Sequence, residues 1–483
     1  MKLKKLTVFL LCFILAFTSV MPVGNAYGFI KIADMENGEE VSQLYDAIID
    51  YIVENYKYDV TRDDLLTAAV TAFLKSHPEY FNEMGKAAFK ALDENSSFYT
   101  YEEYTDVYAD VSGIYVGIGI YVSQEGTKIV LGEPTEGSPA DGSGLQVGDI
   151  ITAVDDVPVT DFALDRVTSM IKGVPGTEVK ITVLRNDIEY SYTLTRAEIR
   201  INPVTYNIIE ETDIGYVKIS SFNANTIVAF DEAMKYFAEN GIEKIVLDLR
   251  NNLGGYLDAA IAVASYFVPD SKLVVIKEGK TEDDNVYYYA NETENKFKAV
   301  VLINQYSASA SEVVSSILRD YGTGTLVGKR SYGKGTVQEV NQVIRSGHFL
   351  WMTKAEYYTP SHTKIHKTGL EPDHYVTNTT EKFDMNSITS YDILRVLKVG
   401  DTGEDVRAVK ERMKILGYQL TVDDVYDNAT AAAVESFQKA TELFPYGVAD
   451  ITTQVKINDV LADSDVVVDK QYERAVELAK RLK

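Results

Sequence analysis

Residues 248–255 read Asp-Leu-Arg-Asn-Asn-Leu-Gly-Gly. This stretch closes an apolar segment that has the length and composition of a buried strand, and a helical segment follows it. The segments predicted as strands are 214–219, 244–249 and 299–303, and the helical segments between them are 226–240 and 259–267. Strands that alternate with helices indicate an α/β core, which we place at 199–385.

Two further stretches come later in the same core. Residues 307–312 read Ser-Ala-Ser-Ala-Ser-Glu, and they connect the last predicted strand to a helix that begins near Ser311. Residues 333–338 read Gly-Lys-Gly-Thr-Val-Gln. Along the chain, the last predicted strand is therefore followed by the serine run, then by a helix, and then by a lysine between two glycines.

Together with residues 369–373, Gly-Leu-Glu-Pro-Asp, these stretches resemble the carboxyl-terminal processing peptidases, also called tail-specific proteases, over residues 96–376. The resemblance implies that Ser309 is the catalytic nucleophile, that Lys334 is its general base and that Gln338 orients the lysine. It also implies an exported serine endopeptidase that cleaves protein substrates at or near their carboxyl termini.

The proposed base must satisfy two physical conditions. Lys334 can remove a proton from a serine only as a neutral amine, and lowering its pKa from about 10.4 to about 7 or 8 costs roughly 4 kcal/mol, which a dry pocket must supply. Residues four apart in a straight strand are about 13 Å apart, which is too far for Gln338 to reach the lysine. Because glycines flank Lys334, we predict that no regular strand contains both residues.

An acyl-transfer site also needs donors for developing negative charge. Ser309 precedes a predicted helix, so the backbone amide of Ala310 is one expected oxyanion donor. The turn at Gly254 and Gly255 is expected to supply the second, because glycine lets the backbone approach substrate closely. Leu253 stands where the family usually has proline, so the sequence leaves open which glycine donates.

Residues 106–198 are expected to form a separate domain of short β-rich segments and glycine turns, typical of a compact, partly open β-barrel. The expected strands are 115–122, 128–131, 149–154 and 179–184. The sequence resembles a PDZ domain, although Asp156 replaces a usual glycine and Gly142-Ser143 a more helical pair. The motifs that carry this resemblance are 116–120, 138–140, 144–145 and 148–151.

The PDZ resemblance implies a binding loop for a peptide carboxylate. Its residues are Gly117, Ile118, Gly119 and Ile120. Glycines let successive backbone amides converge on an anion, and an open sheet edge accepts a peptide as an added strand. The alternative is a small barrel in which the glycines serve only as turns.

The amino-terminal part is expected to be a signal segment followed by a helical module. Residues 1–26 combine lysines, an apolar run and Gly24-Asn25-Ala26, the order of a secretory signal, with an uncleaved membrane anchor as the alternative. Residues 27–105 show helical spacing from about 41 to 92, and packing or contact within a homodimer is their expected role. Either form of the signal places the protein outside the cytoplasm.

The carboxyl-terminal part is expected to hold a three-helix module at 392–464 and a final helix at 465–483. The order of motifs in the module resembles a peptidoglycan-binding domain. Its first Asp-Gly-x-Phe-Gly turn is replaced by residues 424–428, Asp-Val-Tyr-Asp-Asn, and the second, at 446–450, is also altered. Cell-wall binding and a purely structural helical cap therefore both stay open.

Composition excludes several classes of function. A net charge of −25 disfavours nucleic acid as a partner. The only cysteine, Cys12, lies in the signal segment, which excludes disulfides and cysteine-bound metals in the mature chain. No cofactor and no metal are expected, since His362 and His366 have metal-like spacing but no adjacent acidic partner.

Three other interpretations of the same residues are weaker. A Ser/His/Asp hydrolase could use His362, His366 or the pair Asp373-His374, but no Gly-x-Ser-x-Gly elbow surrounds a serine. Residues 328–335 nearly form a phosphate-binding loop, yet Gly335 stands where Ser or Thr is required. A non-catalytic scaffold of PDZ and wall-binding units would need none of the three catalytic candidates. The overall prediction is a multidomain α+β serine peptidase.

Overall fold

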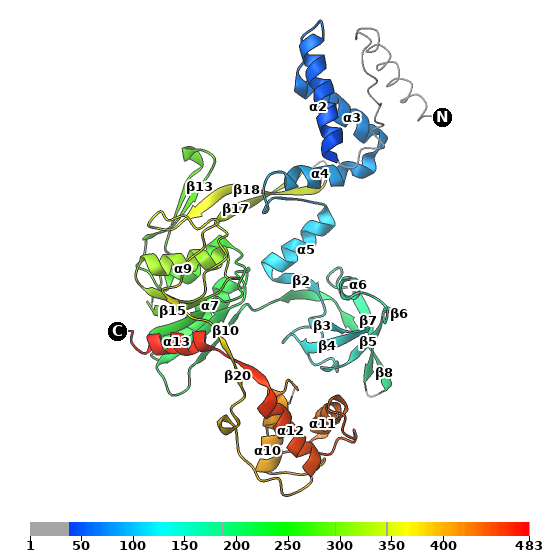
Figure 1. Cartoon of the computed structure of the whole chain (residues 1–483), viewed down its shortest axis with the longest axis vertical. Helices are drawn as coiled ribbons and strands as arrows, with labels where there is room; N and C mark the ends of the chain where they lie inside the picture. Colours follow the sequence, from blue (N-terminus) through cyan, green and yellow to red (C-terminus); the bar gives the residue numbers. More distant parts are fainter. Residues whose placement is uncertain (1–37, 186, 295, 344–345, 419, 483) are drawn as a thin grey trace, which may run out of the picture. The chain divides into compact units, whose positions relative to one another are not determined.

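The computed structural model describes residues 38–185, 187–294, 296–343, 346–418 and 420–482 (Figure 1). The chain divides into two compact units, one up to Ala88 and one from Phe89 onward. The predicted signal segment, 1–26, lies outside the described residues. No helix among the described residues is both long enough and apolar enough to cross a membrane.

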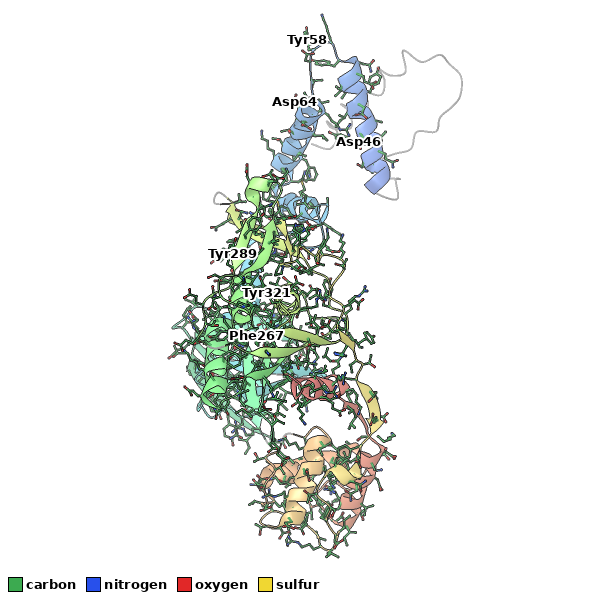
Figure 2. All side chains as sticks on the ribbon, turned by 90° about the vertical axis from the view of Figure 1, so that its left-hand side faces the viewer. Asp46, Tyr58, Asp64, Phe267, Tyr289 and Tyr321 are labelled. Atoms are coloured by element: carbon green, nitrogen blue, oxygen red, sulfur yellow. The ribbon has the colours of Figure 1, made fainter. Side chains whose placement is uncertain are left out.

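The first unit is helical, as the spacing predicted. Helix α2 spans Gly38–Asn55, α3 spans Arg62–Ser76 and α4 spans Phe81–Lys90. Thr61 and Asp64 close a capping box at the start of α3, which satisfies backbone amides that have no partner inside the helix. Figure 2 shows Asp46 on α2 and Asp64 at the start of α3, and Arg62 forms an ion pair with Asp46.

The PDZ-like part of the second unit is an antiparallel sheet in the order β3-β4-β5-β7-β8, with β6 paired to β5. The strands are β3 Ile120–Glu125, β4 Lys128–Pro134, β5 Ile150–Val154, β6 Val157–Pro158, β7 Glu178–Arg185 and β8 Ile188–Thr195. Helix α6, Leu164–Ile171, contributes Val167 and Ile171 to the core of this sheet.

The structure differs from the predicted strand at 115–122. Two strands occupy it: β2, Ile114–Gly117, pairs with β9, Ala197–Arg200, and β3 begins only at Ile120. Gly119 separates them with a φ of 77°, a left-handed conformation that interrupts a strand and that glycine adopts without strain.

The α/β core is a six-stranded sheet in the order β10-β11-β12-β15-β16-β19. Its strands are β10 Val204–Ile208, β11 Ile214–Ile219, β12 Lys244–Asp248, β15 Lys298–Ile303, β16 Gly324–Gly328 and β19 His374–Tyr375. All neighbours are parallel except β10, which runs antiparallel to β11. The predicted strands and their alternation with helices are confirmed.

Helices cover both faces of this sheet. On one face lie α7 Thr226–Glu239, α8 Leu257–Ser265 and α9 Ala310–Asp320, and on the other lies α13 Lys470–Ala479. Successive residues of a strand point to opposite faces, so Ile245 and Leu247 pack in the cluster with the first three helices, whereas Val246 packs with Ala475 and Ala479 of α13. Figure 2 labels Phe267, which follows α8, and Tyr321, which follows α9 and donates to Leu273 O at 2.7 Å.

A second sheet carries the segments beside the lysine. Its order is β1-β18-β13-β14, and β17 also pairs with β18. The strands are β1 Ser97–Tyr99, β13 Leu273–Glu278, β14 Val286–Tyr289, β17 Thr336–Val343 and β18 His348–Tyr358. Helix α5, Tyr101–Ser112, follows β1, and its Tyr104 ring stacks on Phe349 of β18 with centroids 3.8 Å apart.

The carboxyl-terminal module is inserted within the core. Its three helices are α10 Glu404–Ile415, α11 Asn428–Ala440 and α12 Ile451–Asp463. The chain enters through β20, Thr379–Lys382, and returns through β21, Asp465–Val468, and these two strands pair antiparallel. The final helix therefore starts at Lys470 rather than at 465, because residues 465–468 complete this ribbon.

Helix α13 is predicted to be required for stability of the core. Ala475 is fully buried against the sheet, so Ala475→Asp would bury an unpaired carboxylate and lower the free energy of unfolding by at least about 3 kcal/mol. Lys480→Gln, at an exposed position at the end of the same helix, should change it by no more than about 0.5 kcal/mol. Urea unfolding measures both variants, and equal values would contradict this packing.

Candidate active site

Ser309 lies at a sharp turn between β15 and α9. Its φ of 53° and ψ of −114° are uncommon for a residue other than glycine, and such a conformation persists only where the surroundings impose it. The Ser309 N–H donates to Glu312 Oε2 at 2.9 Å, the Ala308 N–H donates to Asn252 O at 3.0 Å, and Ser307 Oγ donates to Leu249 O at 2.8 Å. These bonds hold the turn against the end of β12.

Glu312 joins this turn to the segment that carries the lysine. Its side chain is 1% exposed and accepts hydrogen bonds from four groups. The donors are Ser309 N–H at 2.9 Å, Ser331 Oγ at 2.5 Å, Gly333 N–H at 2.7 Å and Lys334 N–H at 2.8 Å. Burial raises the pKa of Glu312 and outweighs the opposing effect of these donors.

Glu312 was not among the site residues predicted from the sequence. The sequence nevertheless contains a pattern that points to it, because a serine followed three residues later by glutamate at a helix start is typical of a capping box. That pattern accounts for the bond to the Ser309 N–H. It does not reveal the bonds to Gly333 and Lys334, which come from another part of the chain.

Lys334 is held in a loop that ends where β17 begins. Gly333 has a φ of 94°, and a Cβ there would lie 2.9 Å from Gly369 N, while a Cβ on Gly335 would lie 2.5 Å from His366 N. Both glycines are therefore needed for this loop to pack against residues 365–369. Burial of the amine lowers the pKa of Lys334 from its ordinary value.

The predicted bend between Lys334 and Gln338 is confirmed. Strand β17 contains Gln338 but starts at Thr336, and its pairing with β18 shifts register between Val337 and Gln338. The Gln338 amide nitrogen donates to Thr336 Oγ1 at 2.9 Å and to Thr353 Oγ1 at 3.1 Å. Within the described part of the chain, Lys334 Nζ forms no hydrogen bond to Ser309 or Gln338.

One cavity of about 630 Å³ is lined by the three predicted catalytic residues and by both glycines of the 248–255 stretch. Apolar side chains form much of its wall, which limits access of water to the amine. The lining includes Ser309, Lys334, Gln338, Gly254, Gly255, Leu253, Leu257, Val337, Val340, Tyr288, Trp351 and Tyr357.

Gly254 lies directly against the serine turn, and Gly255 lies against the backbone of Phe222. A Cβ on Gly254 would be 2.8 Å from both Ala308 O and the Ser309 Cβ, and one on Gly255 would be 2.1 Å from Phe222 O. The Gly254 N–H donates to Asn252 Oδ1 at 2.8 Å. Ala310 is the first residue of α9, so its amide has no acceptor within the helix.

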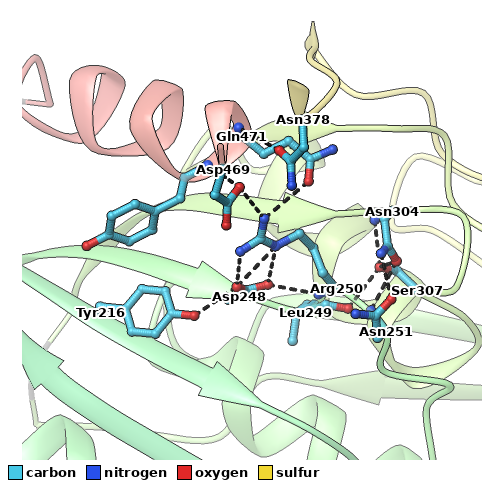
Figure 3. A network of polar contacts seen from close by, with 11 residues as sticks. Tyr216, Asp248, Leu249, Arg250, Asn251, Asn304, Ser307, Asn378, Asp469 and Gln471 are labelled. Atoms are coloured by element: carbon cyan, nitrogen blue, oxygen red, sulfur yellow. Dashed lines mark hydrogen bonds and ion pairs between the residues drawn. The ribbon is translucent and has the colours of Figure 1, made fainter. Parts of the chain in front are cut away.

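Arg250 anchors the loop at residues 250–255, called here the glycine loop, to α13 (Figure 3). Its guanidinium binds Asp248, at 2.6 Å to Oδ2, and also Asp469 Oδ1 at 2.7 Å and Gln471 Oε1 at 3.2 Å. Tyr216 donates its hydroxyl to Asp248 Oδ2 at 2.8 Å. Burial opposes the charge of Arg250, but the two carboxylates outweigh it and raise the pKa of the guanidinium.

The predicted carboxylate-binding loop lines a separate cavity of about 320 Å³ beside α6. Gly117, Ile118, Gly119 and Ile120 all contribute, opposite Thr168, Ile171 and Lys172. The Ile118 and Gly119 carbonyls accept bonds of 2.9 and 2.8 Å from the Ala140 and Thr135 amides, which fixes the loop backbone.

The alternative sites predicted from the histidines and from residues 328–335, the possible phosphate-binding loop, do not fit this arrangement. His374 pairs with β16 in the core sheet, His362 stacks on Tyr358 and contacts Glu278 at 2.7 Å, and no histidine is among the residues that line the cavity around Ser309. A strand, β17, follows residues 328–335, whereas a phosphate-binding loop leads into a helix.

Family models match three parts of the chain. The "Peptidase family S41" model matches residues 213–376, the "PDZ domain" model residues 106–184 and the "Putative peptidoglycan binding domain" model residues 402–457. The fold class, with its PDZ, peptidase and helical wall-binding-type domains, is thereby confirmed.

Curated relatives are similar over most of the chain. A "Probable CtpA-like serine protease" of Staphylococcus haemolyticus (strain JCSC1435) is 32% identical over 395 residues, 81% of this chain and 77% of the relative. The protein of the same description from Staphylococcus aureus (strain N315) is 32% identical over 402 residues, 80% of this chain and 79% of the relative.

Solved structures of similar proteins include a processing protease and a PDZ domain. The photosystem II D1 C-terminal processing protease is 25% identical, covers 70% of this chain and 93% of its own, and has a TM-score of 0.40. The PDZ domain of a carboxy-terminal protease from Vibrio cholerae, solved with a peptide, is 29% identical over 18% of this chain and 99% of its own, with a TM-score of 0.18.

Glu312→Gln is expected to lower stability. Each carboxylate oxygen of Glu312 accepts hydrogen bonds from two of the four donors. An amide nitrogen in place of either oxygen would face two buried N–H or O–H groups that it cannot accept from, which lowers the free energy of unfolding by about 1–3 kcal/mol. Glu371→Gln, which removes an exposed ion pair with Arg330, should cost less than about 1 kcal/mol. Denaturant unfolding of both variants tests this difference, and an unchanged Glu312→Gln protein would contradict it.

Proposed function

The chain belongs to the CtpA-like serine proteases of peptidase family S41, and from this premise we propose that it is an exported endopeptidase with a Ser309–Lys334 catalytic dyad. The observation that carries the proposal is the shared carboxylate of Glu312, which binds the backbone amides of both residues at the wall of one cavity. Proximity fixed in this way converts a collision between two groups into a step within one site.

The proposed reaction is an acyl transfer in two halves. Neutral Lys334 takes the proton of Ser309 Oγ as the oxygen attacks the carbonyl carbon of the scissile peptide bond. The lysine then gives this proton to the nitrogen of the leaving amine, the C–N bond breaks, and an acyl-enzyme remains on Ser309. Water attacks the ester with Lys334 again as base, the C–O bond to the serine breaks, and the proton returns to Ser309.

Gln338 is proposed to orient the amine of Lys334. Its two amide hydrogens are donated to Thr336 and Thr353, so its carbonyl oxygen is the group left to accept a hydrogen from the lysine. The single lone pair of the neutral amine then faces Ser309.

The oxyanion donors are proposed to be the amides of Ala310 and Gly255. Ala310 begins α9, so its N–H has no acceptor within the helix, and the helix dipole favours negative charge there. Of the two glycines, Gly254 already donates its N–H to Asn252, which favours Gly255 as the second donor.

The PDZ domain is proposed to hold the carboxyl terminus of the substrate in the cavity lined by residues 117–120. Backbone amides in a glycine-containing loop suit a carboxylate, and the apolar side chains of Ile118, Ile120 and Ile171 suit an apolar terminal residue.

Location and assembly complete the proposal. A signal at residues 1–26 would export the chain, and the module matched at residues 402–457 would associate with peptidoglycan. A homodimer through the amino-terminal helices stays a prediction, which the exposed apolar side chains of Leu44 and Ile48 on α2 favour.

Activity is predicted to rise with pH. Burial lowers the pKa of Lys334, so the neutral, active form of the amine should accumulate at a pH below its ordinary pKa of 10.5. Cleavage of an unfolded test protein, followed from about pH 6 to pH 10, should increase with pH in the wild type, while Ser309→Ala and Lys334→Ala lose at least about 100-fold. A Lys334→Ala protein as active as the wild type would end the dyad proposal.

Recognition of the substrate terminus is predicted to depend on its charge. A peptide with a free carboxyl terminus should be cleaved with a kcat/KM about tenfold or more above that of the same peptide carrying a terminal amide. In Gly119→Ala this preference should disappear, because a Cβ at Gly119 would lie 2.1 Å from the Ser138 Cβ and displace the loop. Equal cleavage of the two peptides by the wild type would contradict terminal recognition by the PDZ domain.

A further inference from the structure

A chain of hydrogen bonds leads from Gln338 to a carboxylate far away in the sequence. Gln338 of β17 lies opposite Thr353 of β18 in the register of the two strands and donates to its hydroxyl at 3.1 Å. Thr353 Oγ1 donates in turn to Asp93 Oδ1 at 3.2 Å. Asp93 precedes β1, whose Ser97 pairs with Trp351 of β18, so the sheet itself brings the carboxylate to this position.

Ser96 fixes the other side of the same carboxylate. Its hydroxyl donates to Asp93 Oδ2 at 2.9 Å and makes a longer contact of 3.4 Å with Thr353 Oγ1. The Thr353 N–H donates to Ser96 Oγ at 3.1 Å. Asp93, Ser96 and Thr353 therefore form a closed polar cluster next to Gln338.

The charge state of Asp93 determines which group donates in each hydrogen bond between Gln338, Thr353 and Asp93. Burial raises the pKa of Asp93, but donors from Asn95, Ser96 and Thr353 together lower it below the ordinary value. An ionised carboxylate can only accept hydrogen bonds, so the Thr353 hydroxyl donates its one hydrogen to Asp93. Thr353 Oγ1 can then only accept from Gln338, which has to present its NH₂ group and not its carbonyl oxygen.

We propose that Asp93 is a positioning residue that sets the amide orientation of Gln338 through Thr353, and thereby the direction of the Lys334 amine. This inference rests on the proposed function of Lys334 as the general base. A neutral amine has two hydrogens and one lone pair. An amide carbonyl takes one of the hydrogens and leaves the lone pair for Ser309, whereas a reversed amide would donate to the lone pair and block the base.

Substitutions at Thr353 and Asp93 test the inference. Thr353→Val removes the hydroxyl at nearly constant shape, and Asp93→Asn offers an amide that can donate, which lets the Thr353 hydroxyl turn toward Gln338. Both should lower kcat about tenfold to a hundredfold with KM changed less than about twofold, because substrate binding is untouched and the base is misdirected. Thr353→Ser keeps the hydroxyl and should retain most of the wild-type kcat.

A double-mutant cycle with Gln338→Ala separates this role from a general loss of structure. If Asp93 acts through Gln338, adding Asp93→Asn to Gln338→Ala should lower kcat no further than Gln338→Ala alone. Additive losses, a rise in KM at constant kcat, or a wild-type kcat in Thr353→Val would each overturn the inference.

Matched controls keep the result interpretable. Thr281 and Asp284 form the same hydroxyl–carboxylate pair, at 2.7 Å, and neither lines the cavity, so Asp284→Asn should leave kcat unchanged. Ser309→Ala and Lys334→Ala are measured alongside. Full activity in those two would refute the proposed function itself, whereas their inactivity together with wild-type kcat in Asp93→Asn and Thr353→Val would refute only the inference about Asp93.

Discussion

The buried carboxylate of Glu312 is the constraint on which the arrangement of Ser309 and Lys334 depends. It binds the backbone of Ser309 on one side and the backbone of Gly333 and Lys334 on the other, so two segments that are separate in sequence share one acceptor. Its bonds go to backbone amides and to Ser331, and no ion pair to Lys334 Nζ occurs in the described part of the chain. A carboxylate bonded to the amine would raise the pKa of the lysine, whereas this arrangement leaves burial free to lower it.

A second constraint ties the glycine loop to the end of the chain. Arg250 holds Asp248 at the end of β12 and Asp469 at the start of α13, and α13 follows the inserted wall-binding-type module. Because the module begins and ends at the paired strands β20 and β21, the core is completed only after the chain has returned from it. The helix that closes the core thus also supports the loop beside Ser309.

The sequence predicted the elements whose signals are local. The serine run, the glycine-flanked lysine and the apolar strands were recognisable from adjacent residues, and the bend before Gln338 followed from glycine chemistry. Contacts set by strand pairing were not predictable: Asp93 and Thr353 are 260 residues apart, and nothing in either neighbourhood specifies the other. The division of 115–122 at Gly119 and the β20–β21 ribbon were missed for a similar reason, since each depends on a partner strand distant in sequence.

The most direct test is to titrate the Lys334 amine itself. Nuclear magnetic resonance of lysine labelled with ¹³C at the ε carbon, in Ser309→Ala protein with a bound substrate peptide, reports its protonation, and Lys334→Met identifies the signal by its loss. If the amine is desolvated, this one resonance should titrate below the ordinary lysine pKa of 10.5. A Lys334 signal that titrates at or above that value, as an exposed ammonium would, would contradict the claim that a desolvated lysine drives catalysis.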